Sequence, residues 1–375
     1  MSSKQAIVIG AGIVGLATAR ALALKGFKVK VVERNSKAVG ASVRNFGMVW
    51  PIGQPEGELY ERALRSRTIW KEFSDAGAFW SDEVGSLHVA YNETEWNVLN
   101  ELYEVYKKDR PVLLLHPDEV LKKSEAVVPM NLKGALYSAD ELIVDPREAI
   151  AALPAALEEK HHVEFHWDKC VSYISDGTVY IGNEEQFEAD IVFICSGADF
   201  ETLYPESFNE YPLTKCKLQM MRMAAQPNDW RMGPALCGGL SLIHYNSFKV
   251  ASSLPELKSK YETEMSGYLD WGIHVMVSQN GSGELTVGDS HEYGATHDPF
   301  DKAFINELIL DYLKRFAQFK NWQVIETWNG IYPKLTNGDT ELFFSPEAGV
   351  YVLNGLGGAG MTLSFGLAEE VVKNL

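Results

Sequence analysis

The stretch AIVIGAGIVGLATARALALKGFKVKVVER, residues 6–34, decides the fold. It reads as a buried strand, a Gly10-x-Gly12-x-x-Gly15 turn, an amphipathic helix and a second strand that ends at Glu33. In such a unit the first glycine permits a tight turn, the second lets a pyrophosphate approach the backbone, and the third lets the helix pack closely on the strand. Free N–H groups at the helix N-terminus meet the phosphates, and Glu33 can accept hydrogen bonds from a ribose. The pattern predicts an adenine dinucleotide site; the alternative is a strand-to-helix turn that binds no ligand.

The composition is that of a globular protein with a sizeable core. A length of 375 residues allows two domains, or one domain with a large insertion, and the chain is 46% hydrophobic and 23% charged. The formal net charge of -17 argues against nucleic acid or anionic lipid as a partner, because both are polyanions. A local cationic pocket is still compatible with this charge.

The cysteines indicate a reducing compartment. Cys170, Cys195, Cys216 and Cys237 are widely spaced, with no C-x-x-C motif and no metal-type spacing, so we expect reduced core or strand residues and a cytoplasmic protein. Residues 5–19 are apolar like part of a secretion signal, but the glycine spacing favours the nucleotide-binding unit. No other stretch reaches the length of a membrane span, so no membrane partner is expected.

The patterning changes along the chain. The segment EADIVFICSGADF, residues 188–200, reads as an almost unbroken apolar run that ends in Ser196-Gly197, which suits a strand covered on both faces, whereas several alternating strands follow one another closely between about 211 and 293. The sequence therefore predicts a nucleotide-binding domain interrupted by an antiparallel domain, with the substrate at the contact between them. Helical patterns occur at 56–79, 93–108, 117–124, 146–159 and 299–318, and strand patterns at 85–92, 135–145 and 241–248.

A second glycine cluster lies near the C-terminus. Residues 349–372 read as a strand, then Gly355-x-Gly357-Gly358-x-Gly360, then a helix. A nicotinamide enzyme has no obvious need for this second turn. A flavin held lengthwise does, because backbone N–H groups and a helix N-terminus can stabilise the electron-rich edge of its reduced isoalloxazine.

Together the two clusters resemble the FAD-dependent oxidoreductases of the D-amino-acid oxidase type, the group that contains glycine oxidase and sarcosine oxidase. The resemblance covers essentially the whole chain. It rests on VVER (31–34), GAS-x-RN-x-G (40–47), VDP (144–146), CSGA (195–198), GELTVGDS (283–290), WNGIYP (328–333) and GGAGMTLSFGLAEE (357–370).

The resemblance implies an α/β fold, with a Rossmann-like FAD-binding domain and an inserted, mainly antiparallel α+β substrate domain. The implied FAD-binding segments are 1–84, 144–212 and 322–375, and the substrate-binding segments are 85–143 and 213–321. Non-covalent FAD is favoured, because no cysteine lies between WNGIYP and GGAGMT. The implied cofactor-binding residues are Gly10, Gly12, Ile13, Val14, Gly15, Glu33, Arg34, Ser42, Arg44, Asn45, Gly47, Val171, Ser196, Gly197, Gly330, Gly355, Gly357, Gly358, Ala359, Gly360, Met361 and Thr362.

One position departs from the resemblance. Glycine-oxidase-like proteins usually carry, where this chain has Tyr332, an arginine that grips the substrate carboxylate, and a phenol cannot replace a bidentate guanidinium. Either the substrate lacks a carboxylate at that place or other groups bind its anion; each candidate could instead be an ordinary surface or ion-pair residue. The candidate substrate-site residues are His244, Tyr332, Lys334, Arg222 and Tyr245. Arg44 is a further candidate cation, and His291 is a further candidate histidine. Trp50, Trp271 and Trp328 could form the wall of an apolar cavity or could be ordinary core residues.

His244 and Tyr245 are neighbours in a predicted strand, so at most one of them is expected to face the flavin. RNFGMVWP, KLQM, HY-x-SF and GDSHEYG also resemble a subgroup associated with aminophosphonate breakdown. A phosphonate needs several donors, which would suit His244, Tyr332 and Lys334.

The expected function is FAD-dependent oxidation of a C–N bond in a small, anionic amine: an N-alkyl glycine, a D-amino acid or an aminophosphonate. Hydride transfer to flavin N5, hydrolysis of the imine and reoxidation by O₂ would complete the reaction. A flavin-dependent hydroxy-acid dehydrogenase or hydroxylase is one alternative. A non-catalytic flavin-binding sensor is the other.

Overall fold

The opening βαβ unit belongs to a six-stranded sheet. The computed structural model describes residues 4–182 and 185–375, so residues 1–3 and 183–184 of the expected FAD-binding segments lie outside the described residues. The sheet is parallel except for its last strand, β20, which runs antiparallel to β21. Its strands, in spatial order, are β20 (Leu342–Glu347), β21 (Val350–Asn354), β13 (Ile191–Ile194), β1 (Gln5–Ile9), β2 (Lys28–Val32) and β9 (Glu164–His166).

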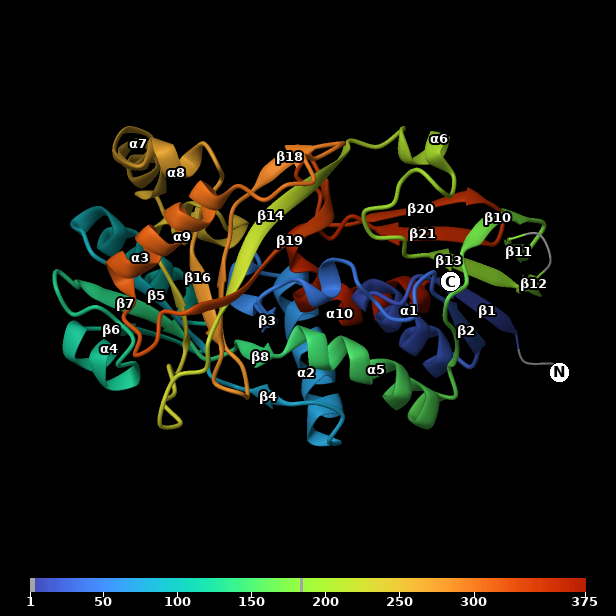
Figure 1. The fold of residues 1–375 in the computed structure, drawn as a ribbon, viewed down its shortest axis with the longest axis horizontal. Coiled ribbons are helices and arrows are strands. Elements are labelled where there is room, and N and C mark those ends of the chain that lie inside the picture. Colours follow the sequence, from blue (N-terminus) through green and yellow to red (C-terminus); the bar gives the residue numbers. More distant parts are fainter. Residues whose placement is uncertain (1–3, 183–184) are drawn as a thin grey trace.

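This sheet is covered on both faces, as the apolar runs predict. Along β1, Ala6 and Val8 belong to a core cluster formed with helices, whereas Ile7 and Ile9 belong to a cluster formed with the small sheet β10-β11-β12. The helices around the first cluster meet near the middle of the molecule (Figure 1). They are α1 (Ile13–Leu24), α2 (Glu58–Asp75), α5 (Pro146–His161) and α10 (Gly360–Lys373); the small sheet consists of β10 (Val171–Ser175), β11 (Thr178–Ile181) and β12 (Glu185–Glu188), and α6 is Pro205–Phe208.

A nine-stranded, mostly antiparallel sheet forms the other half of the molecule, at the left of Figure 1. Long strand β14 pairs with β19 along its length, and β17 and β18 pair with its other edge. The strand that carries WNGIYP therefore lies in this sheet, whereas the sequence-based division placed it in segment 322–375 with the FAD-binding domain. The strands are β18 (Glu292–Gly294), β14 (Leu213–Met223), β17 (Leu285–Gly288), β16 (Met276–Gln279), β15 (Ala235–Cys237), β5 (Ser86–Ala90), β7 (Gly134–Ser138), β6 (Val112–Leu115) and β19 (Val324–Leu335).

Among the described residues, five α-helices lie in this half. Three of them, α3, α4 and α9, fall where helical patterns were predicted, whereas α7 and α8 lie between β15 and β16 and were not predicted. A third small sheet joins the two halves. The helices are α3 (Glu93–Tyr106), α4 (Pro117–Lys123), α7 (Leu254–Glu264), α8 (Ser266–Leu269) and α9 (Ala303–Phe316); the joining sheet is β3 (Met48–Val49), β8 (Leu142–Val144) and β4 (Ser81–Asp82).

The predicted strand over 241–248 is wrong. The segment forms two short 3₁₀ helices, η3 (Gly239–Ile243) and η4 (Asn246–Val250). Alternate Leu240 and Leu242 are both buried, which imitates the period of a strand. The chain turns instead because Gly238 packs directly against α9, where a Cβ atom would lie 2.7 Å from ring atoms of Tyr312 and Phe316.

The four cysteines are unpaired, and three of them are buried. Cys170 is exposed, so the expectation of a core or strand position is wrong for this residue. It lies in the loop that precedes β10.

Glu141 gives the fold a pH dependence. Its fully buried carboxylate accepts hydrogen bonds from the Ile52 N–H (3.0 Å) and the Ser86 hydroxyl (2.9 Å). Burial raises the pKa of Glu141 to about 7 from an ordinary value of 4.5. The folded state therefore binds this proton more tightly, and its stabilising contribution is present below the ordinary pKa and is lost as the pH rises through 7.

We expect Glu141→Gln to remove roughly 3 kcal/mol of pH dependence from the free energy of unfolding between pH 4.5 and 8. Urea titrations across this range measure the effect. The exposed Glu104→Gln is the control and should keep the wild-type pH dependence. Parallel curves for wild type and Glu141→Gln would contradict the prediction.

Candidate functional site

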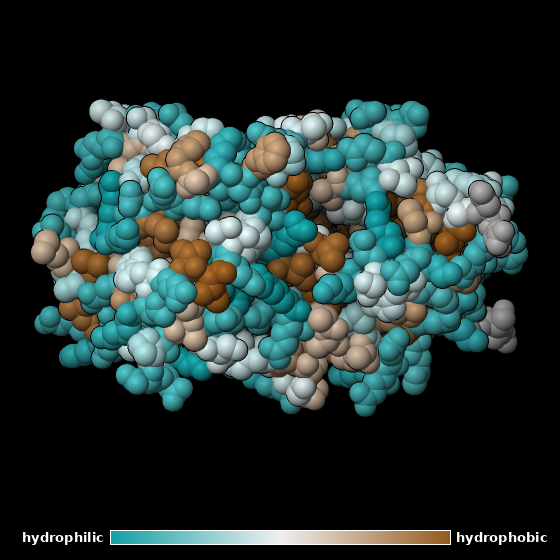
Figure 2. Space-filling model, in the orientation of Figure 1, coloured by the Kyte–Doolittle hydropathy of each residue, from teal (hydrophilic) through white to brown (hydrophobic). Residues whose placement is uncertain are grey.

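A cavity of about 1150 Å³ extends from the first glycine turn to the terminal glycine loop and to the large sheet. The face in Figure 2 is mostly hydrophilic and is hollowed near the junction of the two halves. The cavity is therefore long, and elements from both ends of the chain contribute to its wall.

The first glycine turn has the predicted geometry. Gly10 has a φ of +103°, and a Cβ atom there would lie 2.5 Å from the Cys195 carbonyl oxygen. A Cβ atom on Gly15 would lie 1.9 Å from the Gly10 carbonyl oxygen, so helix α1 lies against the turn only because residue 15 has no side chain. Gly15 is not on the cavity wall, which agrees with its predicted role in packing.

Glu33 closes the same end of the cavity. One carboxylate oxygen accepts a hydrogen bond from the Ala11 N–H (2.9 Å), and the other accepts one from the Asn35 N–H (3.0 Å). These bonds fix the carboxylate beside the glycine turn, at the position from which it could accept from a ribose hydroxyl. The neighbouring Arg34 lines the cavity too, but its guanidinium is paired with Asp199.

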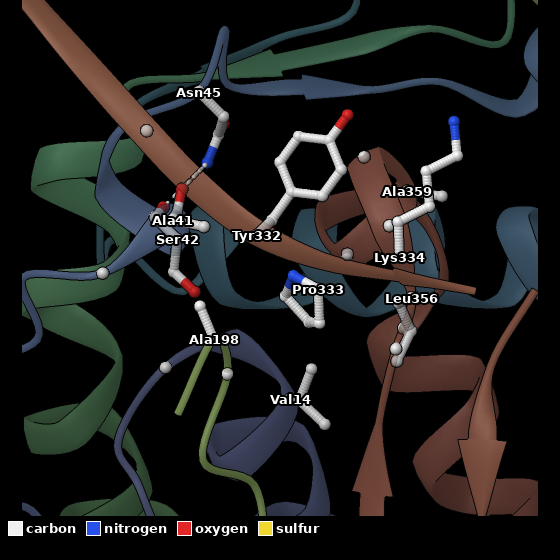
Figure 3. A pocket seen from close by; sticks show the side chains of 18 of the residues that line it. Val14, Ala41, Ser42, Asn45, Ala198, Tyr332, Pro333, Lys334, Leu356 and Ala359 are labelled. Atoms are coloured by element: carbon white, nitrogen blue, oxygen red, sulfur yellow. Dashed lines mark hydrogen bonds between the residues drawn. The ribbon is translucent and has the colours of Figure 1, made fainter. Parts of the chain in front are cut away.

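The loop after β2 folds onto the start of α1. The Ser42 hydroxyl, in η1 (Ala41–Val43), accepts a hydrogen bond from the Ile13 N–H (2.9 Å). The Asn45 amide donates to the Ala41 and Ser42 carbonyl oxygens (3.1 and 2.9 Å), as drawn in Figure 3. Asn45 also accepts from the Gly47 N–H (2.8 Å). Hydrogen bonds within the chain therefore hold the shape of this loop.

Gly47 and Arg44 support the loop in different ways. Gly47 lies off the cavity wall, has a φ of +72°, and has no room for a Cβ atom, which would lie 1.9 Å from the Val144 carbonyl oxygen. Arg44 lines the cavity and donates a hydrogen bond to the Asn329 carbonyl oxygen (3.0 Å). Arg44 thus ties the loop to β19, and Gly47 shapes the backbone.

The terminal glycine loop lies beside the opening one. Gly355 and Gly357 have φ values of +75° and +57°, and η5 (Gly357–Ala359) leads directly into α10. A Cβ atom on Gly360 would make an ordinary contact, 3.6 Å, with the Ile13 side chain at the start of α1. The Thr362 hydroxyl accepts a hydrogen bond from the Trp50 N–H (2.9 Å). Both ends of the chain therefore enclose one continuous cavity.

Strand β19 forms the next part of the wall. Tyr332 and Lys334 extend to one side of the strand and Pro333 to the other (Figure 3). Burial raises the pKa of the Tyr332 phenol well above its ordinary value, so the hydroxyl remains protonated and can donate a hydrogen bond. The Lys334 ammonium donates to the Tyr293 hydroxyl (3.1 Å).

Both His244 and Tyr245 line the cavity, so the expectation that at most one of them faces it is wrong. The reason is that both residues lie in the turn between η3 and η4, where side chains do not alternate between two faces as in a strand. The Tyr245 hydroxyl contacts the Met276 sulfur (3.1 Å).

Three histidines gather on this wall. The ring of His244 is tilted by 35° against that of His274, with centroids 3.7 Å apart, and His274 is stacked on His291 at 5.0 Å. The carboxylate of Asp289 lies 3.3 Å from His274 Nε2. Burial lowers the pKa of His291 to about 4 and those of His244 and His274 well below their ordinary value. The imidazoles are therefore neutral at neutral pH.

The sequence analysis missed His274 and Asp289. Both lie at strand ends of the large sheet, in GIHVMVSQ and GDSHEY, where alternation indicated ordinary strand residues. The available signal was a histidine in each of three successive segments that read as strands, because neighbouring strands bring such residues together. In the structure this holds for His274 and His291, which lie beside strand ends, whereas His244 lies between η3 and η4.

Arg222 is placed elsewhere. It lies on β14 outside the cavity wall, is 3% exposed, and its guanidinium contacts Glu284 (2.7 Å) and Asp145 (3.4 Å). Its position gives no support to the expected role in binding a substrate anion.

Trp50 lines the cavity, whereas Trp271 and Trp328 do not. The expected residues that the cavity does bring together are Gly10, Gly12, Ile13, Val14, Glu33, Arg34, Ser42, Arg44, Asn45, Val171, Ser196, Gly197, His244, Tyr245, His291, Gly330, Tyr332, Lys334, Gly355, Gly357, Gly358, Ala359, Gly360, Met361 and Thr362.

The fold and the cavity define an α/β dinucleotide-binding protein. The glycines that leave room for a pyrophosphate, the fixed Glu33 carboxylate and the second glycine loop all fit FAD held lengthwise. The chain belongs to the family of FAD-dependent oxidoreductases abbreviated DAO, and the match covers residues 5–374. It is accordingly an enzyme that uses FAD.

Known proteins of similar sequence include a glycine oxidase of Pseudomonas aeruginosa, 26% identical over 58% of this chain and 62% of that protein. A Pseudomonas fluorescens MnmC, a bifunctional protein of tRNA 5-methylaminomethyl-2-thiouridine biosynthesis, is 24% identical over 62% of this chain and 35% of that protein. The matched region thus spans less than two thirds of either relative. The fold is similar to that of glycine oxidase from Geobacillus kaustophilus, with a TM-score of 0.77 and 20% identity, covering 100% of this chain and 95% of that one.

Within residues 4–182 and 185–375, none of the helices combines the length and the apolar character needed to cross a membrane.

Proposed function

We propose that this enzyme oxidises a C–N bond in a small anionic amine or amino acid. The observation that carries the proposal is one continuous cavity that is lined by the terminal glycine loop, Tyr332 and the three histidines. A substrate in this cavity would lie between the FAD-binding loops and the large sheet. The names of similar proteins support an amine: glycine oxidase, and an iminodiacetate oxidase of Chelativorans with a TM-score of 0.73 and 20% identity.

Bound FAD would supply the oxidation, by taking a hydride from the carbon next to the amine nitrogen and passing the electrons to O₂. The side chains of this protein would orient the substrate and keep water away. Tyr332 would donate a hydrogen bond to the anionic end of the substrate, and Lys334 would add positive charge beside it. The neutral imidazoles could accept a hydrogen bond from the amine N–H, but their lowered pKa values mean that they would not take its proton. Water would then hydrolyse the imine product.

N-alkyl glycines, D-amino acids and aminophosphonates are the proposed substrate classes. A flavin-dependent hydroxy-acid dehydrogenase is the second candidate, because the same fold occurs in an L-α-glycerophosphate oxidase of Mycoplasma pneumoniae, with a TM-score of 0.71 and 18% identity. The two candidates differ in the bond that is oxidised, C–N or C–O.

An anaerobic screen of flavin bleaching tests the proposal. The purified protein should be yellow, lose its colour with one of the three amine classes, and regain it in air. Hydroxy acids serve as the competing substrates, and NAD(P)H consumption tests for a hydroxylase. Bleaching by a hydroxy acid alone would establish the second candidate, and a colourless, folded protein that takes up no FAD would refute both.

Tyr332→Phe and His244→Ala should each raise KM or lower turnover by about 10–100-fold, because each removes a hydrogen-bonding group on the substrate side of the cavity. The FAD content should remain that of the wild type. Steady-state kinetics and the flavin absorbance of the same preparations check this. Loss of flavin, with normal kinetics after reconstitution, would count against a substrate role for the residue.

A further inference from the structure

Several buried polar atoms in the cluster of three histidines and Asp289 have no hydrogen-bond partner among the described residues. Neither ring nitrogen of His274 has a hydrogen-bond partner among the described residues, although this histidine is only 5% exposed. Asp289 Oδ1, in a residue 4% exposed, is also without a hydrogen bond. It lies 3.3 Å from His274 Nε2, but the two groups are not aligned for one. Buried polar atoms without partners are costly, at about 1–3 kcal/mol each.

The tautomer of His291 is fixed by the backbone. His291 Nδ1 lies 2.9 Å from the Gly272 carbonyl oxygen, which can only accept, so Nδ1 carries the proton. The lone pair is therefore on Nε2, which lies 3.9 Å from Asp289 Oδ2. A histidine whose second nitrogen donates to a backbone carbonyl is the usual arrangement of a metal ligand.

The ring nitrogens of His244, His274 and His291 lie close together. One nitrogen from each ring lies within 4.8 Å of the others, and His244 is exposed to the cavity that all three line. The lone pairs of the three imidazoles and the carboxylate of Asp289 would attract a cation and repel an anion. Imidazole ligands select a transition metal ion over Mg²⁺ or Ca²⁺, which prefer oxygen.

We propose that His244, His274 and His291 bind a divalent transition metal ion such as Zn²⁺, with Asp289 as a fourth ligand or as the carboxylate that offsets its charge. Three histidine ligands leave a coordination position open toward the cavity. There the ion, together with Lys334, would attract an anionic group of a bound molecule. This last consequence rests on the proposed function; the metal site itself does not.

The test uses the full chain with FAD bound. After dialysis against a chelator, the protein should bind about one Zn²⁺ per chain, measured by mass spectrometry of the metal content, and its melting temperature should rise with added Zn²⁺. His274→Gln and His291→Gln should each weaken Zn²⁺ binding at least tenfold, and Asp289→Asn about tenfold. His116→Gln, an exposed histidine outside the cluster, should bind Zn²⁺ like the wild type.

X-ray absorption on the wild-type protein loaded with Zn²⁺ covers the case in which a variant fails to fold. Three imidazole nitrogens at about 2.0–2.1 Å are expected in the first shell. A first shell of oxygen atoms alone, wild-type affinity in His274→Gln, or no binding of Zn²⁺ by the wild type would each overturn the proposal. No amine is present in these measurements, so a protein that binds Zn²⁺ but is bleached by no amine would refute the proposed function and leave the metal site standing.

Discussion

Gly15→Ala should destabilise the protein by about 3 kcal/mol and lower its affinity for FAD at least tenfold. The added Cβ atom would lie 1.9 Å from the Gly10 carbonyl oxygen and 3.4 Å from the Val8 side chain. The first contact is with backbone, which cannot rotate away as a side chain could. Helix α1 would have to move off β1, and this movement would carry the N–H groups at its N-terminus away from the pyrophosphate site.

Thermal unfolding and titration of the FAD-free protein with FAD measure the two effects. Gly267→Ala is the matched control: the same atom is added at a glycine with no neighbour within 4 Å and an ordinary φ. It should leave the FAD affinity unchanged and should keep or slightly raise the melting temperature, because Gly267 lies in helix α8. An unchanged melting temperature and FAD affinity in Gly15→Ala would show that α1 can shift without disturbing the cofactor site.

The two glycine turns could be predicted because their requirements are local. Gly10 needs a positive φ, and Gly15 must not carry a Cβ atom; both conditions arise within a single strand-turn-helix unit. The same holds for Glu33, which ends the next strand. The contact of the terminal loop with the first turn is not local, and it was predicted only through the resemblance of the whole chain to a family.

The features that the sequence did not reveal depend on partners far along the chain. Strand β19 pairs with β14 through main-chain hydrogen bonds between residues 213–223 and 324–335. It therefore lies in the large sheet, although in sequence it is close to the C-terminal strands of the parallel sheet. His274 and Asp289 become neighbours only through the sheet, and nothing in either segment by itself indicates a site. The 3₁₀ turns around His244 follow from packing of Gly238 on α9, which lies more than sixty residues further along the chain.

Arg222 illustrates the limit most clearly, since a buried arginine and a substrate-binding arginine look alike in a sequence. In the structure Arg222 joins β14 of the large sheet to the loop before α5, where Asp145 also caps the helix by accepting from the Arg147 N–H (2.9 Å). Its second partner, Glu284, lies beside β17. The guanidinium thus holds two carboxylates from different halves of the molecule.

Arg222→Ala should therefore lower the free energy of unfolding by about 3–5 kcal/mol, because it removes the positive partner of two carboxylates in a largely buried network. The KM for the amine should stay at the wild-type value at a temperature where the variant is folded, since Arg222 is outside the cavity wall. Denaturant titration and steady-state kinetics separate the two effects. Arg147→Ala is the control: Arg147 pairs with Glu326 at 2.6 Å on the surface, where such a pair contributes about 0–1 kcal/mol. A raised KM with unchanged stability in Arg222→Ala would return this arginine to the substrate site.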